Sequence, residues 1–203
     1  DGRLSFTGGL RYTDETSKAS VLDADPVWTT RESYDNLSPS VTLAFAPNPN
    51  VNLYAKVSTG YNAGSIPVRA STRAAFSIPV GEEKLTAYEV GIKSEWLNRR
   101  LRLNAAAYYY DYDDLQVSDF REGSTILTNA GKARIVGFEV ELAAVPLPGL
   151  TVTANYGYTD FKYREFIVGG VDVADIARPP YAPKHTAGGA IDYVFPAFSF
   201  GTL

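Results

Sequence analysis

Hydrophobic and polar side chains alternate with a period of two residues along much of this chain. In residues 51–58, valine, leucine and alanine occupy the odd positions, and polar or amphipathic residues occupy the even positions. The same alternation recurs in residues 88–96, 136–142 and 150–158. Successive side chains of a β-strand point to opposite faces of its sheet, and no segment here shows a sustained helical period. The pattern therefore predicts an almost entirely β protein whose strands have one apolar and one polar face.

Short turn sequences separate the alternating segments at nearly constant intervals. They are APNPN at 46–50, LNRR at 97–100, VPLPG at 145–149 and FPAF at 195–198, which are about 50 residues apart. Proline, glycine and asparagine are residues that favour turns. Longer polar stretches lie between these turns, at 14–36, 61–82, 115–131 and 160–184. We therefore predict about eight strands of ten or more residues, joined alternately by tight turns and long loops.

Long two-faced strands with tight turns at one end and long loops at the other are typical of outer-membrane β-barrels. Such a strand crosses the bilayer in about 9–11 residues. Aromatic side chains gather at two levels here, as expected for the two membrane interfaces. Near the tight turns these are Phe45, Trp96 and Phe195, and near the long loops they are Tyr12, Tyr61, Tyr108 to Tyr110, Tyr156, Tyr158 and Phe161. The predicted fold class is an all-β, antiparallel, up-and-down transmembrane β-barrel.

The alternation also assigns residues to the two faces of this sheet. We expect the concave inner face to carry Glu89, Lys93, Glu95, Glu139 and Glu141. We expect the convex face, toward lipid, to carry Val51, Leu53, Val90, Ile92, Val136, Phe138, Val140 and Val152. A register slip of one residue would exchange the two sets.

Two other architectures are compatible with parts of this pattern. Propeller blades also repeat at about 50 residues, but each blade holds four short strands instead of two long ones. Eight strands are also enough to close a small complete barrel, which would serve as a membrane anchor or a lipid-modifying enzyme. We expect instead that these residues do not close a barrel alone. The first and last strands would then not pair with each other, and each would have an edge that is unpaired or pairs with strands outside this chain.

Composition narrows the function classes. The 203 residues carry a net charge of −4 and include 14 Tyr, 10 Phe, 17 Gly, no Cys and a single histidine, His185. The lack of cysteine excludes a disulfide framework and a thiol nucleophile, and the lack of a basic stripe argues against nucleic acid. No nucleophile motif or apolar run of about 18 residues occurs, so we expect no enzymatic activity, no cofactor and no transmembrane helix.

Four carboxylates cluster in residues 111–119, and they raise the question of a metal site. Closely spaced oxygen ligands suit Ca²⁺, but the glycine-containing loop that would turn them toward one ion is missing. The simpler interpretation is the solvated outer end of a strand, and we predict no metal site. The carboxylates are those of Asp111, Asp113, Asp114 and Asp119.

Several segments, in this order along the chain, resemble the barrel domain of TonB-dependent outer-membrane receptors. They are LSFTGGLRYTDE, VSTGYNAGSIP, EKLTAYEVGIKSEWLNRRLRLNAAAYYYDYDDLQV, TNAGKARIVGFEVEL and YAPKH. The resemblance implies about eight strands of a larger barrel of roughly 22 strands with a plugged lumen. On this interpretation residues 1–203 are part of a single barrel domain, and the plug domain and the closing strands lie outside the chain.

The resemblance also implies a function. Receptors of this family sit in the outer membrane of Gram-negative bacteria and take up scarce nutrients, most often ferric siderophores or similar iron complexes. The expected partners are the small-molecule chelate, outer-membrane lipid with lipopolysaccharide, and the TonB energy-transducing complex, which would be reached through the plug region.

Candidate substrate-binding residues lie in the loop at 61–81. This loop contains Arg69 and Arg73 and no acidic residue, so it is locally positive on an acidic chain. Such a loop can attract anions, and arginine binds carboxylates and phosphates through two hydrogen bonds. Tyr61 and Phe76 would supply apolar contacts, and three lumen-facing tyrosines, Tyr108, Tyr110 and Tyr112, complete the predicted set. The alternative is that the two arginines only contact lipopolysaccharide phosphates.

Overall fold

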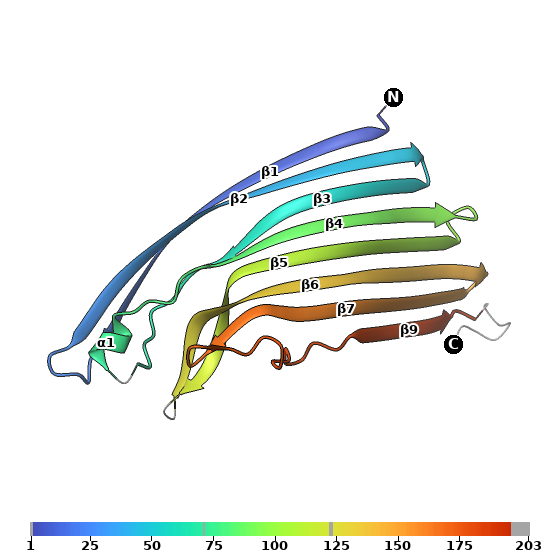
Figure 1. Cartoon of the computed structure of the whole chain (residues 1–203). Coiled ribbons are helices and arrows are strands. Elements are labelled where there is room, and N and C mark those ends of the chain that lie inside the picture. The colour runs from blue at the N-terminus through green and yellow to red at the C-terminus, as the bar shows by residue number, and fades with distance from the viewer. Residues whose placement is uncertain (1, 71, 122–123, 196–203) are drawn as a thin grey trace.

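The chain folds into one antiparallel sheet in which neighbours along the sequence are neighbours in space (Figure 1). The computed structural model describes residues 2–70, 72–121 and 124–195, apart from the side chains of residues 118–126 and 130. The strands in these ranges are β1 (Leu4–Val21), β2 (Trp28–Asn48), β3 (Val51–Asn62), β4 (Glu83–Trp96), β5 (Leu101–Arg121), β6 (Ser124–Leu147), β7 (Leu150–Val168), β8 (Val171–Asp172) and β9 (His185–Tyr193). β9 pairs with β7, and the short β8 pairs with the end of β7. This order confirms the predicted up-and-down topology.

Three of the four predicted tight turns join neighbouring strands at one end of the sheet. They connect β2 to β3, β4 to β5, and β6 to β7. In the second turn Leu97, Asn98 and Arg99 have φ values of 54°, 55° and 67°, and in the third Gly149 has φ 85°. Left-handed residues of this kind reverse the chain within a few positions. The fourth turn, at 195–198, extends beyond the described residues.

Two of the predicted long loops, at 14–36 and 115–131, are wrong. β1 and β2 remain paired as far as Val21 and Trp28, and β5 and β6 pair as far as Arg121 and Ser124. Outside the bilayer the outer face of a hairpin meets water instead of lipid, so the apolar alternation that marks a membrane strand disappears while the backbone ladder continues. The loop at 61–82 does leave the sheet, from 63 onward, and it contains one helical turn, α1 (Arg73–Phe76).

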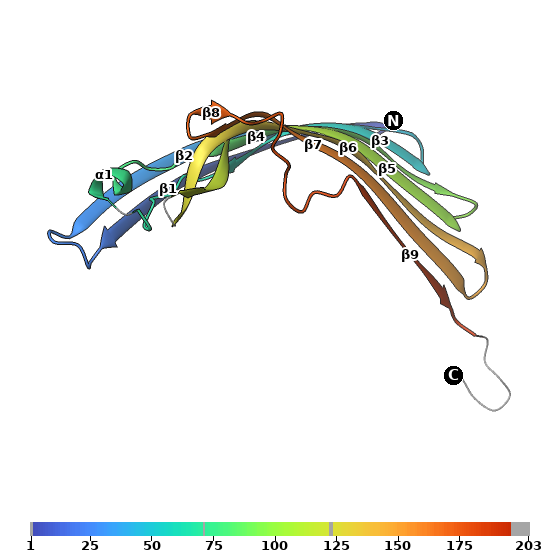
Figure 2. The same ribbon diagram turned by 60° about the horizontal axis from the view of Figure 1, so that its bottom comes forward.

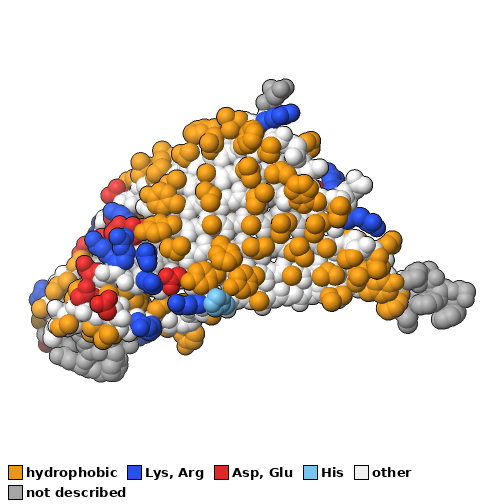
Figure 3. Space-filling model, turned by 45° about the vertical axis from the view of Figure 1, so that its right-hand side comes forward, with side chains coloured by type: hydrophobic (Ala, Val, Ile, Leu, Met, Phe, Trp, Pro, Cys, Tyr) orange, Lys and Arg blue, Asp and Glu red, His pale blue; other side chains and the backbone are white. Residues whose placement is uncertain are grey.

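The two faces of the sheet differ in chemistry as the alternation predicted. Val90 is opposite Ala107, and Ala107 is opposite Phe138, so these side chains form one row of the outer face. Glu89 is opposite Tyr108 in a row of the other face. The sheet bends into an arch (Figure 2), and its convex side is covered by hydrophobic side chains (Figure 3). The pairing register confirms both predicted sets of residues. No helix among the described residues is long and apolar enough to cross a membrane.

The described strands do not close into a ring. Residues 4–12 of β1 pair with residues 37–45 of β2, and β9 pairs only with β7 among the described residues. The interpretation as a complete eight-stranded barrel is therefore wrong, because a closed barrel would join the first and last strands. The propeller is also wrong, since the long strands belong to one continuous sheet.

Tyrosine rings of the inner face cover glycines on the neighbouring strand. Tyr54 is directly opposite Gly91, and a Cβ atom added to Gly91 would lie 2.5 Å from the Tyr54 ring. The Tyr54 hydroxyl donates a 2.7 Å hydrogen bond to Glu89 Oε1. Tyr108 covers Gly137 in the same way. A glycine beneath a ring lets the ring lie flat on the sheet, and this pins the register of the pair.

This arrangement predicts that Gly91→Ala destabilises the barrel. The added methyl group must displace the Tyr54 ring and its hydrogen bond to Glu89. We expect a loss of roughly 1–3 kcal/mol in unfolding free energy, as for other overpacked sites. Urea unfolding of the full-length receptor in detergent measures it.

Gly60→Ala is the matched control, because Gly60 lies on the same face of the adjacent β3 and its nearest side-chain atoms are at ordinary contact distance, 3.6 Å. Equal stability of the two variants would contradict the role assigned to Tyr54.

Candidate functional site

The long loop at 63–82 is folded against the inner face of the first part of β2, which contains Trp28 and Tyr34. Phe76 of α1 is only 1% exposed, and its ring centroid lies 6.1 Å from that of Trp28 on β2. The Tyr34 hydroxyl of β2 donates a 3.1 Å hydrogen bond to the Val80 carbonyl. Two backbone hydrogen bonds, of 3.0 and 2.8 Å, join Ser65 to Val80 and close the base of the loop. The loop therefore has a core of its own.

Two amide side chains fasten this loop to the β5–β6 hairpin. Gln116 Nε2 donates to the carbonyls of Ala63 and Gly81, both at 2.9 Å. Asn129 Nδ2 donates to the carbonyls of Gly81 at 3.0 Å and Asp114 at 2.8 Å, and Asn129 Oδ1 accepts from the Gly81 N–H. Because an amide can donate and accept at once, each clamps several backbone groups. We call Gln116 and Asn129 the amide clamp.

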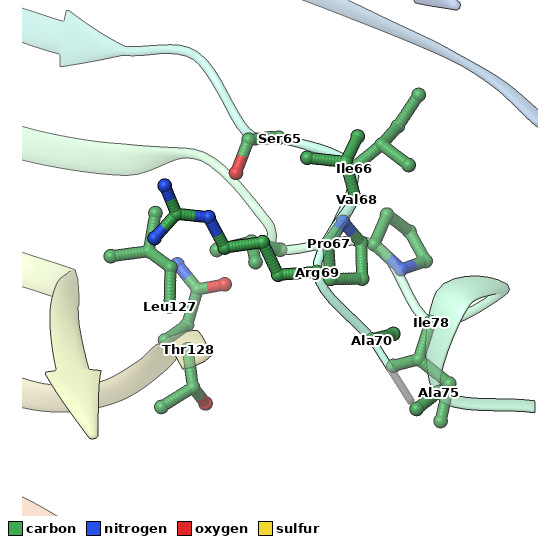
Figure 4. A pocket seen from close by; sticks show the side chains of 13 residues that line it. Ser65, Ile66, Pro67, Val68, Arg69, Ala70, Ala75, Ile78, Leu127 and Thr128 are labelled. Atoms are coloured by element: carbon green, nitrogen blue, oxygen red, sulfur yellow. The ribbon is translucent and has the colours of Figure 1, made fainter. Parts of the chain in front are cut away.

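A cavity of about 480 Å³ lies between the clamped loop and the start of β6. Its walls are largely aliphatic, and Ile66, Pro67 and Leu127 contribute to them. The Arg69 side chain extends across the cavity toward Ser65 and Leu127 (Figure 4). Thr128 and Asn129 add polar atoms, and none of the lining residues in the described part of the chain is acidic. An apolar pocket with one guanidinium suits an organic anion of small-molecule size.

The structure separates the predicted site residues into two groups. Arg69 lines the cavity, whereas Arg73 is exposed on α1 and does not line it. Phe76 was expected to contact the ligand, but it is buried against Trp28 because the loop needs a core residue. Tyr61, at the end of β3, also stays outside the cavity lining, and its buried hydroxyl has no hydrogen-bond partner among the described residues.

The three predicted tyrosines of β5 lie on the inner wall and do not join the loop cavity. Tyr108 and Tyr110 stack with ring centroids 4.7 Å apart, and the Tyr108 hydroxyl is 2.9 Å from Thr159 Oγ1. Tyr112 follows on the same face of β5. Glu89 and Glu139 lie beside the first two of these tyrosines, around a shallow depression of about 350 Å³.

The amide clamp is the part of the site that sequence reasoning missed. Gln116 is the only glutamine of the chain, and Asn129 falls in the TNAG segment. Nothing in either segment indicates which backbone groups the side chains reach. Both act on the loop at 63–82, dozens of residues away, so their role appears only when β5 and β6 are paired.

Charged groups around the site are tied by local contacts. Lys84 Nζ lies 2.7 Å from Glu82 Oε1, and this carboxylate raises the pKa of Lys84. At the end of β8, the Asp172 carboxylate accepts hydrogen bonds from the N–H groups of Phe166 and Ala174, both at 3.0 Å, which lowers the pKa of Asp172. Among the described residues no group of three His, Asp or Glu side chains could hold a metal ion.

These features define a class of protein. A two-faced antiparallel sheet with a hydrophobic convex side, tight turns at one end and a folded, pocket-bearing loop at the other is a wall segment of an outer-membrane β-barrel. The family described as "TonB dependent receptor-like, beta-barrel" matches residues 1–203, and the chain belongs to that family. Its members are receptors and transporters of the Gram-negative outer membrane.

Individual relatives agree with this family. The chain is 33% identical over 100 residues to the ferric-pyoverdine M114 receptor of Pseudomonas sp., a match to 49% of this chain and 12% of the relative. It is 23% identical over 198 residues to the pesticin receptor of Yersinia enterocolitica, a match to 95% of this chain and 28% of the relative. The chain thus spans less than a third of these curated relatives.

Solved structures share the fold. The ferric yersiniabactin uptake receptor of Yersinia pestis superposes with a TM-score of 0.79 at 21% identity, over 99% of this chain and 30% of that one. The siderophore receptor of Acinetobacter baumannii superposes with a TM-score of 0.72 at 19% identity, over 94% of this chain and 29% of that one.

We expect removal of the amide clamp to release the loop without unfolding the sheet. In a Gln116→Ala/Asn129→Ala variant, the carbonyls of Ala63, Gly81 and Asp114 lose their side-chain donors. Each lost hydrogen bond is worth about 1 kcal/mol, so amide exchange in residues 63–82 should accelerate about fivefold or more. Hydrogen–deuterium exchange of the full-length receptor measures this.

Asn50→Ala provides the control, since it removes an amide from the β2–β3 turn at the opposite end of the sheet. If exchange in residues 63–82 is the same in both variants, the clamp does not hold the loop.

Proposed function

We propose that this chain forms part of the barrel wall of a receptor that takes up ferric siderophores or similar iron complexes with energy supplied through TonB. The observation that carries the proposal is the Arg69 cavity on a clamped loop at the end of the sheet away from the tight turns. Relatives described as receptors for ferric pyoverdine and ferric yersiniabactin support the substrate class. The chain is then one segment of a single barrel domain.

The cavity chemistry matches such a ligand in two respects. Iron chelates combine an organic backbone with carboxylate, phenolate or hydroxamate oxygens, and many carry net negative charge. The aliphatic side chains around Ile66 and Leu127 accept the organic backbone of the chelate. The Arg69 guanidinium binds one of its negatively charged oxygen groups. We propose Arg69 as a direct ligand contact and Arg73, on α1, as a contributor to the positive field that attracts the ligand.

The remaining proposed site residues act at a distance from this cavity. Phe76 supports the loop through its contact with Trp28, and Tyr61 lies at the end of β3, the strand from which the loop departs. Tyr108, Tyr110 and Tyr112 line the inner wall, so we propose that they meet the ligand after it leaves the loop cavity, when it enters the barrel.

The proposed partners follow from the two faces. The convex face meets outer-membrane lipid and lipopolysaccharide, and the concave face meets the plug region through which the TonB complex acts. Exposed hydrophobic side chains such as Val90, at 57%, and Phe6, at 70%, support the first contact. The charged inner residues Glu89 and Glu139 support the contact of the concave face with the plug region, because charged side chains belong in the polar interior of a barrel.

The function is tested by iron-limited growth. A strain that lacks its siderophore receptors and expresses the full-length receptor is supplied with ferric pyoverdine or ferric yersiniabactin as the only iron source. We expect growth on at least one chelate of these two chemical classes, and no growth when TonB is deleted. Growth that persists without TonB, or no uptake of any ferric siderophore across a broader panel, would contradict the proposal.

The role of Arg69 has a matched comparison within the same loop. Arg69→Ala should weaken binding of the transported ferric siderophore about tenfold or more, because a charge-assisted hydrogen bond is lost from an apolar pocket. Arg73→Ala removes the same charge outside the cavity lining and should change affinity only slightly. Tryptophan fluorescence titration of both variants compares them. An equal loss of siderophore affinity in both variants would mean that Arg69 acts only through its positive field and not through direct contact. Unchanged siderophore affinity with weaker retention of lipopolysaccharide would mean that the arginines contact the membrane surface instead of the ligand.

A further inference from the structure

A charged cluster lies on the outer face of the sheet where the hydrophobic surface ends. Figure 3 shows blue and red side chains gathered at one end of the hydrophobic convex face, with the only histidine, His185, in pale blue at their border. We call Arg134, Lys162, Lys184 and Asp160 the wall cluster. The pairing register places Arg134 and Asp160 on the same face as Val136 and Tyr158, so these charges continue the lipid-facing side of β6 and β7.

Two cations of this cluster, Lys162 and Lys184, lie beside one carboxylate, that of Asp160. Lys162 Nζ lies 3.4 Å from Asp160 Oδ2, and Lys184 Nζ lies 3.5 Å from Asp160 Oδ1. The Asp160 side chain is only 17% exposed, while those of Lys162 and Lys184 are 55% and 64% exposed. Both distances exceed the 2.7–2.9 Å typical of a charge-assisted hydrogen bond. Each ammonium group has three donors, and both lysine side chains are more than half exposed, so donors remain accessible to a ligand.

Neighbouring charges leave an excess of positive charge. Arg134 is directly opposite Lys162 across β6 and β7, so two like charges lie side by side on this face. Asp111, opposite Arg134 on the other side, is 2.9 Å from Arg164 Nη1. The group of four cations and two carboxylates thus has a net charge of +2 on a chain of −4. Farther out, Lys132 lies 3.9 Å from Asp113 and opposite Glu165, so the two carboxylates there outnumber the single cation.

An aromatic shelf lies directly on the membrane side of the wall cluster. Tyr158 packs against His185 with ring centroids 5.3 Å apart, and the Tyr156 hydroxyl is 2.7 Å from His185 Nδ1. Phe138 packs against both tyrosines, at 5.8 Å. Asp160 is only two residues beyond Tyr158, about 7 Å along the strand. Cations, then aromatic rings, then aliphatic side chains succeed one another along a single wall.

We propose that the wall cluster and its aromatic shelf bind lipopolysaccharide through a phosphate of its lipid anchor. Lys162, Lys184 and Arg134 would hold the phosphate, the rings of Tyr158 and His185 would contact the phosphorylated sugar, and the acyl chains would lie over Phe138 and Val140. The order of these groups along the wall matches the order of phosphate, sugar and hydrocarbon in that lipid. The inference rests on the proposed membrane partner and is independent of the proposed siderophore uptake.

The test compares binding of purified bisphosphorylated lipid A to the full-length receptor in detergent. Wild-type receptor should bind it, and Lys162→Ser/Lys184→Ser should bind at least about tenfold more weakly, because two charge-assisted contacts are lost. Lys18→Ser/Arg31→Ser is the matched control. It also removes two positive charges from the outer face, but on β1 and β2, far beyond the aromatic level, and it should bind like wild type. Dephosphorylated lipid A should bind wild type and the Lys162→Ser/Lys184→Ser variant equally weakly.

Further variants and a competitor ligand complete the test of lipid A binding. Asp160→Asn removes the internal counter-charge and should strengthen lipid A binding, and weaker binding would overturn the proposal. Equal affinity of wild type and Lys162→Ser/Lys184→Ser, or an equal loss in the control variant, would also overturn it. Millimolar inorganic phosphate that competes fully would indicate a site for free phosphate instead of the lipid. Ferric siderophore uptake by the same variants should be unchanged, so failure of this inference and failure of the proposed function are distinguishable.

Discussion

The whole structure depends on the pairing of backbone hydrogen-bonding groups in a region without water. An unpaired N–H or carbonyl costs several kcal/mol in hydrocarbon, so a membrane-crossing strand must have a neighbour along its full length. β2 to β7 meet this requirement through continuous antiparallel ladders. Because side chains alternate across such a ladder, the pairing also decides which residues face lipid. Val90 and Phe138 then share one row, and Glu89 and Tyr108 share another.

The same ladders carry the proposed functional surfaces beyond the membrane. The hairpins β1–β2 and β5–β6 continue past the aromatic level, and each contributes a wall to the loop at 63–82. Trp28 and Tyr34 hold the loop from one side, and the amide clamp holds it from the other. The Arg69 cavity therefore owes its shape to contacts of the loop with both of these hairpins. The wall cluster lies on the opposite face of the same sheet.

The sequence was informative where a side chain can point only to one or the other face of the sheet. Alternation assigned Leu53 and Glu139 to the correct faces, and proline, asparagine and glycine located the turns at 46–50 and 145–149. It failed at 14–36 and 115–131, where water replaces lipid on the outer face and that face no longer needs apolar side chains. It also could not separate Arg69 from Arg73, or recognise Phe76 as a core residue, because those outcomes depend on which strands approach the loop. Gln116 and Asn129 bind backbone groups of Ala63 and Gly81 that are dozens of residues away in the sequence, so no pattern near either residue predicts these contacts.

The most direct test of this account compares the environments of adjacent residues on two strands, β4 and β6. The chain contains no cysteine, so in a cysteine-free full-length receptor single Cys substitutions at Glu89, Val90, Phe138 and Glu139 can each carry a spin label. Electron paramagnetic resonance in lipid vesicles then compares collision with oxygen, which concentrates in lipid, and with a water-soluble nickel complex. The account predicts high oxygen accessibility at positions 90 and 138 and low oxygen accessibility at 89 and 139. The opposite order, or equal access of the nickel complex to all four positions, would contradict the assignment of the convex face to lipid.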